Sequence, residues 1–223
     1  MYYPYDYYLS NPYRSLNPYY PGANYDLGQT YLDPRFPIKK PASISAARLA
    51  LNNEMRTLWE QHDVWTRGVI ISIAEGLADE KFVTARLLKN PKDFGAVFGR
   101  YYGEAVEKEV SRLITEHLVL AAELVKALKR NDQAAAAEIE RKWYANADEM
   151  AKAFNSFNPF YSQVGFQRMF HKHLDLVKSQ AVARLARNYA ADIAAYDEIE
   201  RQSLEMADHF TRGIVQHFPH HFK

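Results

Sequence analysis

Three histidines occupy matching positions in three separate stretches of the chain, "EQHDVWTRGVI", "TEHLVLAAELV" and "HKHLDLVKSQAV". In each stretch apolar residues recur at helical spacing, and the histidine falls on the apolar face; the three are His62, His117 and His173. Imidazole nitrogens that converge in a protein core are ligands for zinc, iron, manganese or copper. The pattern therefore predicts a site for a divalent transition metal, or for a small ligand, inside the protein.

Two aspartates extend the predicted site. His117 is followed along the chain by Asp148 in "NADEM", and His173 by Asp208 in "MADHF". A turn between the members of each pair brings the aspartate roughly level with its histidine. We interpret this as a duplicated helical hairpin, with a histidine on one arm and an aspartate near it on the other. Each aspartate could bind the metal directly or orient a ligating imidazole through its second nitrogen.

The same residues also have a purely structural interpretation. A buried polar layer can fix the register of packed helices, with each histidine donating to a carboxylate or a backbone carbonyl. The ordinary ferritin-like di-iron centre does not fit, because the chain contains no Glu-x-x-His pair. Arg67 and Lys178, each five residues after a core histidine, could receive an anionic ligand at the rim of the pocket. Solvated or surface-paired side chains are the simpler interpretation of both.

Long helices must position these residues. From residue 43 to residue 219 the chain has helical periodicity interrupted by short turns, so we expect an all-α, up-down antiparallel bundle of about five long helices. It comprises the duplicated hairpin and an N-terminal helix. Glycines spaced four apart in "FGAVFGRYYGEAV" indicate a close backbone contact or a loop. The expected helix boundaries are Ser43 or Ser45 as the first N-cap, Asn90-Pro91, Asn131-Asp132, Asn158-Pro159 and a turn near Asn188.

Residues 1–42 differ from the rest in composition. Ten of the sixteen tyrosines lie in the first 31 residues, and seven of the ten prolines lie in the first 41. Turn signals without helical or strand periodicity predict an extended arm. Three interpretations stay open: a tail that packs on its own domain, an arm that grips a neighbouring subunit and so drives self-association, or an adhesive, cross-linkable segment.

Composition excludes several classes of protein. The 28 basic and 27 acidic residues leave a net charge of +1, which argues against nucleic acid or an anionic membrane as the main partner. Without cysteine there is neither a disulfide nor a thiolate metal motif. No apolar run reaches the roughly 18 residues of a membrane-spanning helix, and the amino terminus lacks the features of a signal peptide. No catalytic triad, glycosidase-like carboxylate pair or phosphate-binding glycine loop stands out, so no catalytic residue is assigned.

The stretch from about Ala47 to Pro219 resembles an all-helical family of small proteins from spore-forming Gram-positive bacteria that has no established activity. The likeness is carried by "LWEQHDVWTR", "LLKNPKDFG", "HLVLAAELVKA", "WYANADE", "NPFYS" and "YDEIERQSLEMAD". Members are often labelled acetylglutamate kinase, which implies an α/β fold with glycine-rich loops for ATP. That label does not fit a chain with nine glycines, no Gly-x-Gly and no strand pattern. The resemblance implies a helical bundle and a bacterial source. The expected location of the protein is the cytoplasm or the spore.

Three functional hypotheses follow. The first is a helical bundle that binds a metal ion, or a small ligand, through a His/Asp layer in its core. The alternative is a structural or assembly protein of the cell or spore envelope that acts through its tyrosine-rich arm. A third is a metal-dependent enzyme with an open coordination position. The residues of the predicted layer are His62, His117, His173, Asp148 and Asp208.

Overall fold

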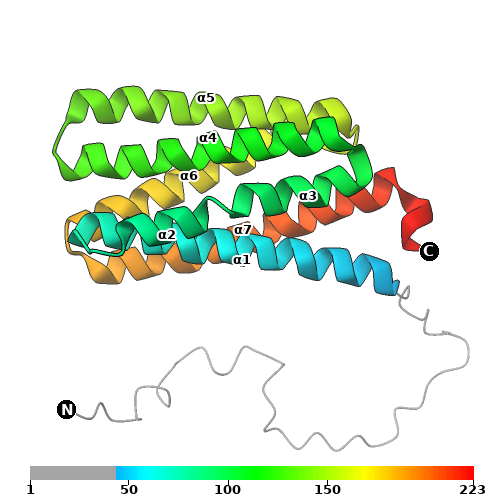
Figure 1. Cartoon of the computed structure of the whole chain (residues 1–223), viewed down its shortest axis with the longest axis horizontal. Helices are drawn as coiled ribbons and strands as arrows, with labels where there is room; N and C mark the ends of the chain where they lie inside the picture. The colour runs from blue at the N-terminus through cyan, green and yellow to red at the C-terminus, as the bar shows by residue number, and fades with distance from the viewer. Residues whose placement is uncertain (1–43) are drawn as a thin grey trace, which may run out of the picture. The chain divides into compact units, whose positions relative to one another are not determined.

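The computed structural model describes residues 44–223, so the predicted arm and any self-association through it lie outside the described residues. The described part is a helical bundle without strands (Figure 1), which confirms the predicted fold class. None of its helices is long and apolar enough to cross a membrane. The helices are α1 (Ala46–Glu75), α2 (Glu80–Leu87), α3 (Asn90–Tyr102), α4 (Glu104–Lys129), α5 (Gln133–Phe157), α6 (Gln163–Leu185) and α7 (Tyr189–His217), followed by the short 3-10 helix η3 (Pro219–Phe222).

The helices pair as three antiparallel hairpins. Two of them, α4 with α5 and α6 with α7, are the hairpins expected from the sequence. In the third, α2 and α3 together run back along α1 (Figure 1). The sequence did not predict this hairpin because the Asn90-Pro91 break divides its return arm into helices of only 8 and 13 residues. The bundle core is therefore built from three hairpins.

Helix caps explain where the turns fall. Ser45 caps α1, Asp132 caps α5 and Asn188 caps α7, each accepting a hydrogen bond from the backbone N–H three residues further on. Pro91 lies in the first turn of α3, where its missing N–H costs no helical hydrogen bond. Gly76, with a φ of 69°, ends α1 in the left-handed conformation. The turns thus lie at or next to the predicted positions.

One of the predicted glycine contacts sets how closely α3 approaches α4. A Cβ atom added to Gly95 would lie 2.7 Å from the backbone oxygen of Glu107 on α4. Such a separation is a steric clash, so only glycine permits this distance between the two helices. The predicted close backbone contact is present, and it holds the return arm of the first hairpin against the second hairpin.

Candidate metal centre

Each hairpin carries a histidine on its first arm and an amide side chain on its second. The amide oxygen lies between 2.9 and 3.1 Å from Nδ1 of the histidine. The amide nitrogen donates to the backbone carbonyl four residues before that histidine. The amide follows its histidine by 28 residues in the first hairpin and by 29 in the other two. The three pairs are His62–Asn90, His117–Asn146 and His173–Gln202.

These bridges fix the tautomer of all three histidines. A backbone carbonyl can only accept a hydrogen bond, so the amide must turn its NH₂ group toward the carbonyl and its oxygen toward the ring. The ring nitrogen facing that oxygen must then be a donor, which places the proton on Nδ1. The lone pair consequently lies on Nε2 in each histidine. A hydrogen bond at one ring nitrogen that leaves the other free is the arrangement found for imidazoles that bind metal.

Burial keeps the three rings neutral. All three line one small cavity in the bundle core, and burial lowers the pKa of His62 to about 4 and that of His117 and His173 to about 3. Neighbouring histidines lower the values for His117 and His173 further. At neutral pH each ring is therefore in the form that can donate a lone pair to a metal.

The second hairpin satisfies its histidine without any ligand. Trp143 lies three residues before the amide of that hairpin, and its Nε1–H donates to Nε2 of His117 over 3.2 Å. The corresponding positions of the first and third hairpins hold Leu87 and Ile199, which are buried and have no donor. Among the described residues, no hydrogen bond reaches Nε2 of the other two core histidines. Their lone pairs face the cavity.

Asp63 departs from the repeat at the position directly after the core histidine. The residue after the core histidine is a buried leucine in the other two hairpins, Leu118 and Leu174, but it is Asp63 in the first. Its side chain is buried; Oδ1 accepts from the hydroxyl of Ser203 over 3.0 Å, and Oδ2 has no partner among the described protein groups. Burial raises the pKa of the Asp63 carboxyl well above its usual range. A half-satisfied carboxyl in place of a core leucine points to a ligand.

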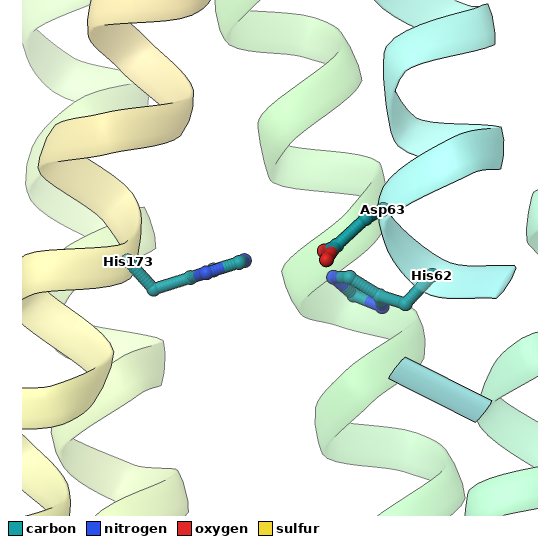
Figure 2. A group of neighbouring side chains, drawn as sticks. All are labelled: His62, Asp63 and His173. Carbon is teal, nitrogen blue, oxygen red and sulfur yellow. The ribbon is translucent and has the colours of Figure 1, made fainter. Parts of the chain in front are cut away.

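His62, Asp63 and His173 form a group that could hold a metal ion. One ligand atom from each lies within 4.8 Å of the others, and the two imidazole rings are 5.8 Å apart between centroids. Figure 2 shows His173 reaching from α6 toward the pair on α1. Atoms bound to one tetrahedral metal ion at about 2.0–2.1 Å lie roughly 3.4 Å apart. A contraction of up to about 1.4 Å, through side-chain rotations, would close the group around an ion.

The cavity beside this group is small and mostly aromatic. Its volume is about 20 Å³, which exceeds the roughly 10–15 Å³ that one water molecule needs. It can therefore hold one water-sized ligand beside an ion, but no organic molecule unless the helices move. Besides the three histidines it is lined by Trp59, Phe94, Phe98, Ile114, Met150, Phe154, Phe170, Leu174 and Phe210.

Two further polar atoms on α1 share the face of Asp63. Trp59 Nε1 and Thr66 Oγ1 are buried and, like Asp63 Oδ2, have no hydrogen-bond partner in the described part of the chain. The three residues are spaced i, i+4 and i+7, so they lie on one side of the helix. Buried polar atoms in proteins are normally paired. Three unpaired polar atoms on one face of α1 could each form a hydrogen bond with, or coordinate, a polar ligand. Core packing alone does not require such atoms.

The two aspartates expected in the layer lie elsewhere. Asp148 accepts from Gln167 and pairs with His171 at 2.7 Å, and 46% of its side chain is exposed. Asp208 pairs with Arg56 at 2.8 Å and is 42% exposed. The expectation that each faces the histidine of its own hairpin is therefore wrong. In α5 the residue facing that histidine lies two positions earlier than Asp148, which is a rotation of about 200° around the helix axis.

The residues expected at the rim of the pocket are engaged in ion pairs and do not line the cavity. Arg67 binds both carboxylate oxygens of the buried Asp192, at 2.7 and 3.3 Å, and lies over the ring of Tyr196. Lys178 pairs with Glu140 at 2.5 Å. Both side chains therefore link neighbouring helices. Lys178 is paired in a partly exposed position, whereas the expectation of a solvated or surface-paired cation is wrong for Arg67, whose partner Asp192 is buried.

The sequence contained a signal for the residues that were missed. The offsets of 28 and 29 residues between histidine and amide are nearly constant across the three hairpins, whereas the offsets to the expected aspartates differ. Asp63 was visible as the one polar residue in the position after an aligned histidine. The amides do not stand out in the sequence, because carboxylates are the more familiar partners of ligating imidazoles.

The amide bridges give a first prediction. Replacing Asn146 with Ala leaves the buried Nδ1–H of His117 without an acceptor, which should lower the free energy of unfolding by about 1–3 kcal/mol. Replacing the half-exposed Asp148 with Ala should cost less than about 1 kcal/mol. Urea unfolding followed by circular dichroism compares the two variants. Equal losses of unfolding free energy in the two variants would show that the amide bridge stabilises the fold no more than a surface ion pair does.

No family model, curated protein or solved structure matches this chain. The kinship with the family of spore-forming bacteria accordingly stays a prediction from sequence.

Proposed function

We propose that this protein binds one divalent transition-metal ion in the core of its helical bundle, through Nε2 of His62, Nε2 of His173 and the carboxylate of Asp63. The observation that carries the proposal is the free, buried carboxylate oxygen at a position where the two equivalent hairpins have leucine. Two neutral imidazoles with their lone pairs free, in the same group, supply the remaining ligands.

The donor set indicates the class of metal. Two nitrogens and one carboxylate oxygen suit zinc, iron(II), manganese and copper, and leave at least one coordination position for another ligand. The adjoining cavity has room for a water molecule in that position. His117 lines the same cavity, but its Nε2 accepts a hydrogen bond from Trp143. We therefore do not assign it as a ligand of the ion.

Metal and proton compete for the Asp63 carboxyl. The raised pKa of Asp63 means that the metal-free protein holds this carboxyl protonated over a wider pH range than an exposed aspartate. A metal binds the ionised form, so its apparent affinity rises with pH until the carboxyl of the free protein is ionised. Neutral histidines add no further proton release at pH 7, because their pKa values are already low.

A polar layer that only sets helix register is the competing interpretation. It accounts for the second hairpin, where both ring nitrogens of His117 have partners. It does not account for Asp63, because a register device gains nothing from a carboxylate oxygen without a partner. The two interpretations differ in whether the isolated protein takes up metal.

Metal titration tests the proposal. The full chain, produced without an affinity tag and with His220→Gln and His221→Gln to remove exposed tail histidines, is titrated with Zn²⁺, Co²⁺, Mn²⁺ and Fe²⁺ by calorimetry. We expect one equivalent of at least one of these ions to bind. His173→Leu should weaken binding by roughly 100-fold or more, because even residues that only orient a ligand contribute 10–100-fold.

The matched control is His209→Leu, which removes an exposed histidine from α7. It should leave the metal affinity unchanged. Absence of stoichiometric binding in the parent protein, or equal binding by His173→Leu, would overturn the proposal and favour the register interpretation.

A further inference from the structure

The boundary between α1 and α7 is the polar side of the candidate metal centre. Along it the helices run antiparallel, and the polar contacts across it include those of Arg56 with Asp208, Asp63 with Ser203, and Arg67 with Asp192. Of these residues Asp63 alone also belongs to the metal-binding group. The Asp63 carboxyl is thus the point at which this boundary meets the core.

Two glutamates lie on the solvent side of the same carboxyl. Glu60 is three residues before Asp63 on α1, and Glu200 is three residues before Ser203 on α7, so each is about one turn from the Asp63–Ser203 contact. Both are near enough for their charges to act on the Asp63 carboxyl. Among the described residues neither glutamate forms an ion pair with a lysine or arginine.

The cations beside this boundary are engaged by other carboxylates, although the charge of Arg56 also acts on Glu60. Arg56 is held by Asp208, and Arg67 by the buried carboxylate of Asp192. The two glutamates therefore leave a local excess of negative charge outside Asp63. Such a field attracts cations and raises their rate of association, with a strong dependence on ionic strength.

Positive charge lines a second surface region near the core, between α6 and α7. A surface groove between α6 and α7 is lined in part by Gln202, the amide partner of His173. This groove contains three cations and one glutamate, and no ion pair within the described part of the chain involves the three cations. They are Arg168, Lys172 and Arg212. A hydrated divalent cation is repelled there, so charge distinguishes the two approaches.

We propose that hydrated divalent cations enter the core between α1 and α7, drawn in by Glu60 and Glu200 and received by Asp63 before the two histidines bind. Asp63 then has two functions, as the first ligand met on entry and as the carboxylate of the completed site. The route rests on the proposed metal site, and it adds a prediction about the rate of loading that the site alone does not make.

Loading kinetics test the route. The full chain with the two tail substitutions is mixed with Co²⁺ at low ionic strength in a stopped-flow instrument, and the visible absorption of bound Co²⁺ is followed. Glu60→Gln combined with Glu200→Gln should slow loading on the order of 10-fold. Affinity at equilibrium should change by less than about 3-fold, because neither glutamate is a ligand. Salt at about 0.5 M should remove most of the difference in rate.

A variant with equal loss of charge serves as the control. Glu123→Gln combined with Glu138→Gln removes two negative charges from α4 and α5 and should load at nearly the parent rate. The route is wrong if both double variants load equally fast, or if Arg168→Gln with Lys172→Gln accelerates loading more than the glutamate variant slows it. If the parent protein binds no Co²⁺, Zn²⁺, Mn²⁺ or Fe²⁺, the metal site fails and the route with it.

Discussion

Acidification should unfold the metal-free protein between about pH 6 and pH 4, with the free energy of unfolding falling by about 3 kcal/mol per pH unit. The cause is the three buried histidines, whose pKa values are lowered by burial to about 4 for His62 and about 3 for His117 and His173. In the unfolded chain each titrates near 6.5. Between these limits the unfolded state binds protons that the folded state rejects.

The sign follows from this difference in proton binding. Each histidine stabilises the folded protein fully above its unfolded pKa, and that contribution is lost as the pH falls toward the folded pKa, at up to about 1.4 kcal/mol per pH unit. Asp63 acts in the opposite direction, because its raised pKa lets the folded state keep a proton that the unfolded chain has released. Asp63 therefore lowers the slope below the roughly 4 kcal/mol per pH unit that three histidines alone would give.

Equilibrium unfolding in urea at a series of pH values measures the slope. Replacing both members of one bridge, His117→Leu with Asn146→Leu, should lower the slope by about 1.4 kcal/mol per pH unit. His209→Gln, on the surface of α7, should leave it unchanged. A flat dependence between pH 6 and pH 4.5 would mean that the core histidines take up protons without unfolding, and that water reaches them freely.

The fold class could be predicted from the sequence because it depends on local sequence patterns. Helical periodicity, the caps at Asp132 and Asn188, and the break at Asn158-Pro159 are each readable from a few neighbouring residues. The return arm formed by α2 and α3 was less visible, since Asn90 and Pro91 interrupt it. Its role depends on packing against α1 and α4, which no local pattern encodes.

The site was predicted in part, for a similar reason. Histidines at core positions are recognisable from apolar periodicity, and all three converge on one cavity. Their partners lie on a different helix, so the choice between Asn146 and Asp148 depends on how one helix is rotated against another. Two residues along a helix correspond to about 200° of rotation, and a hairpin turn is not read from sequence to that accuracy. Asp63 stands out only when the three hairpins are compared, because the other two have leucine at the equivalent position.

Replacing Asp63 with Leu should have opposite effects on stability and on metal binding. In the metal-free protein the change restores the leucine found after the other two core histidines and removes a buried carboxyl with an unpartnered oxygen. We expect the free energy of unfolding at neutral pH to rise by about 1–3 kcal/mol, because replacing buried polar groups by apolar ones of similar volume is often stabilising. Ser203 loses its acceptor, which limits the gain.

Metal should narrow the difference in stability between the two proteins, and should reverse it where Asp63→Leu gains less than about 2 kcal/mol without metal. An ion present at 100 times its dissociation constant stabilises the parent protein by about 2.7 kcal/mol, whereas Asp63→Leu, with affinity reduced roughly 100-fold or more, should gain less than about 0.5 kcal/mol. Thermal unfolding of both proteins with and without Zn²⁺ gives all four values, and Asp208→Asn is the control for a carboxylate on the outer side of the bundle. If Asp63→Leu is less stable than the parent without metal, the carboxyl is a structural partner of Ser203. If it keeps the full response to Zn²⁺, the carboxylate is not a ligand. Only a variant that is more stable alone and less responsive to metal identifies Asp63 as a residue kept for binding at a cost in stability.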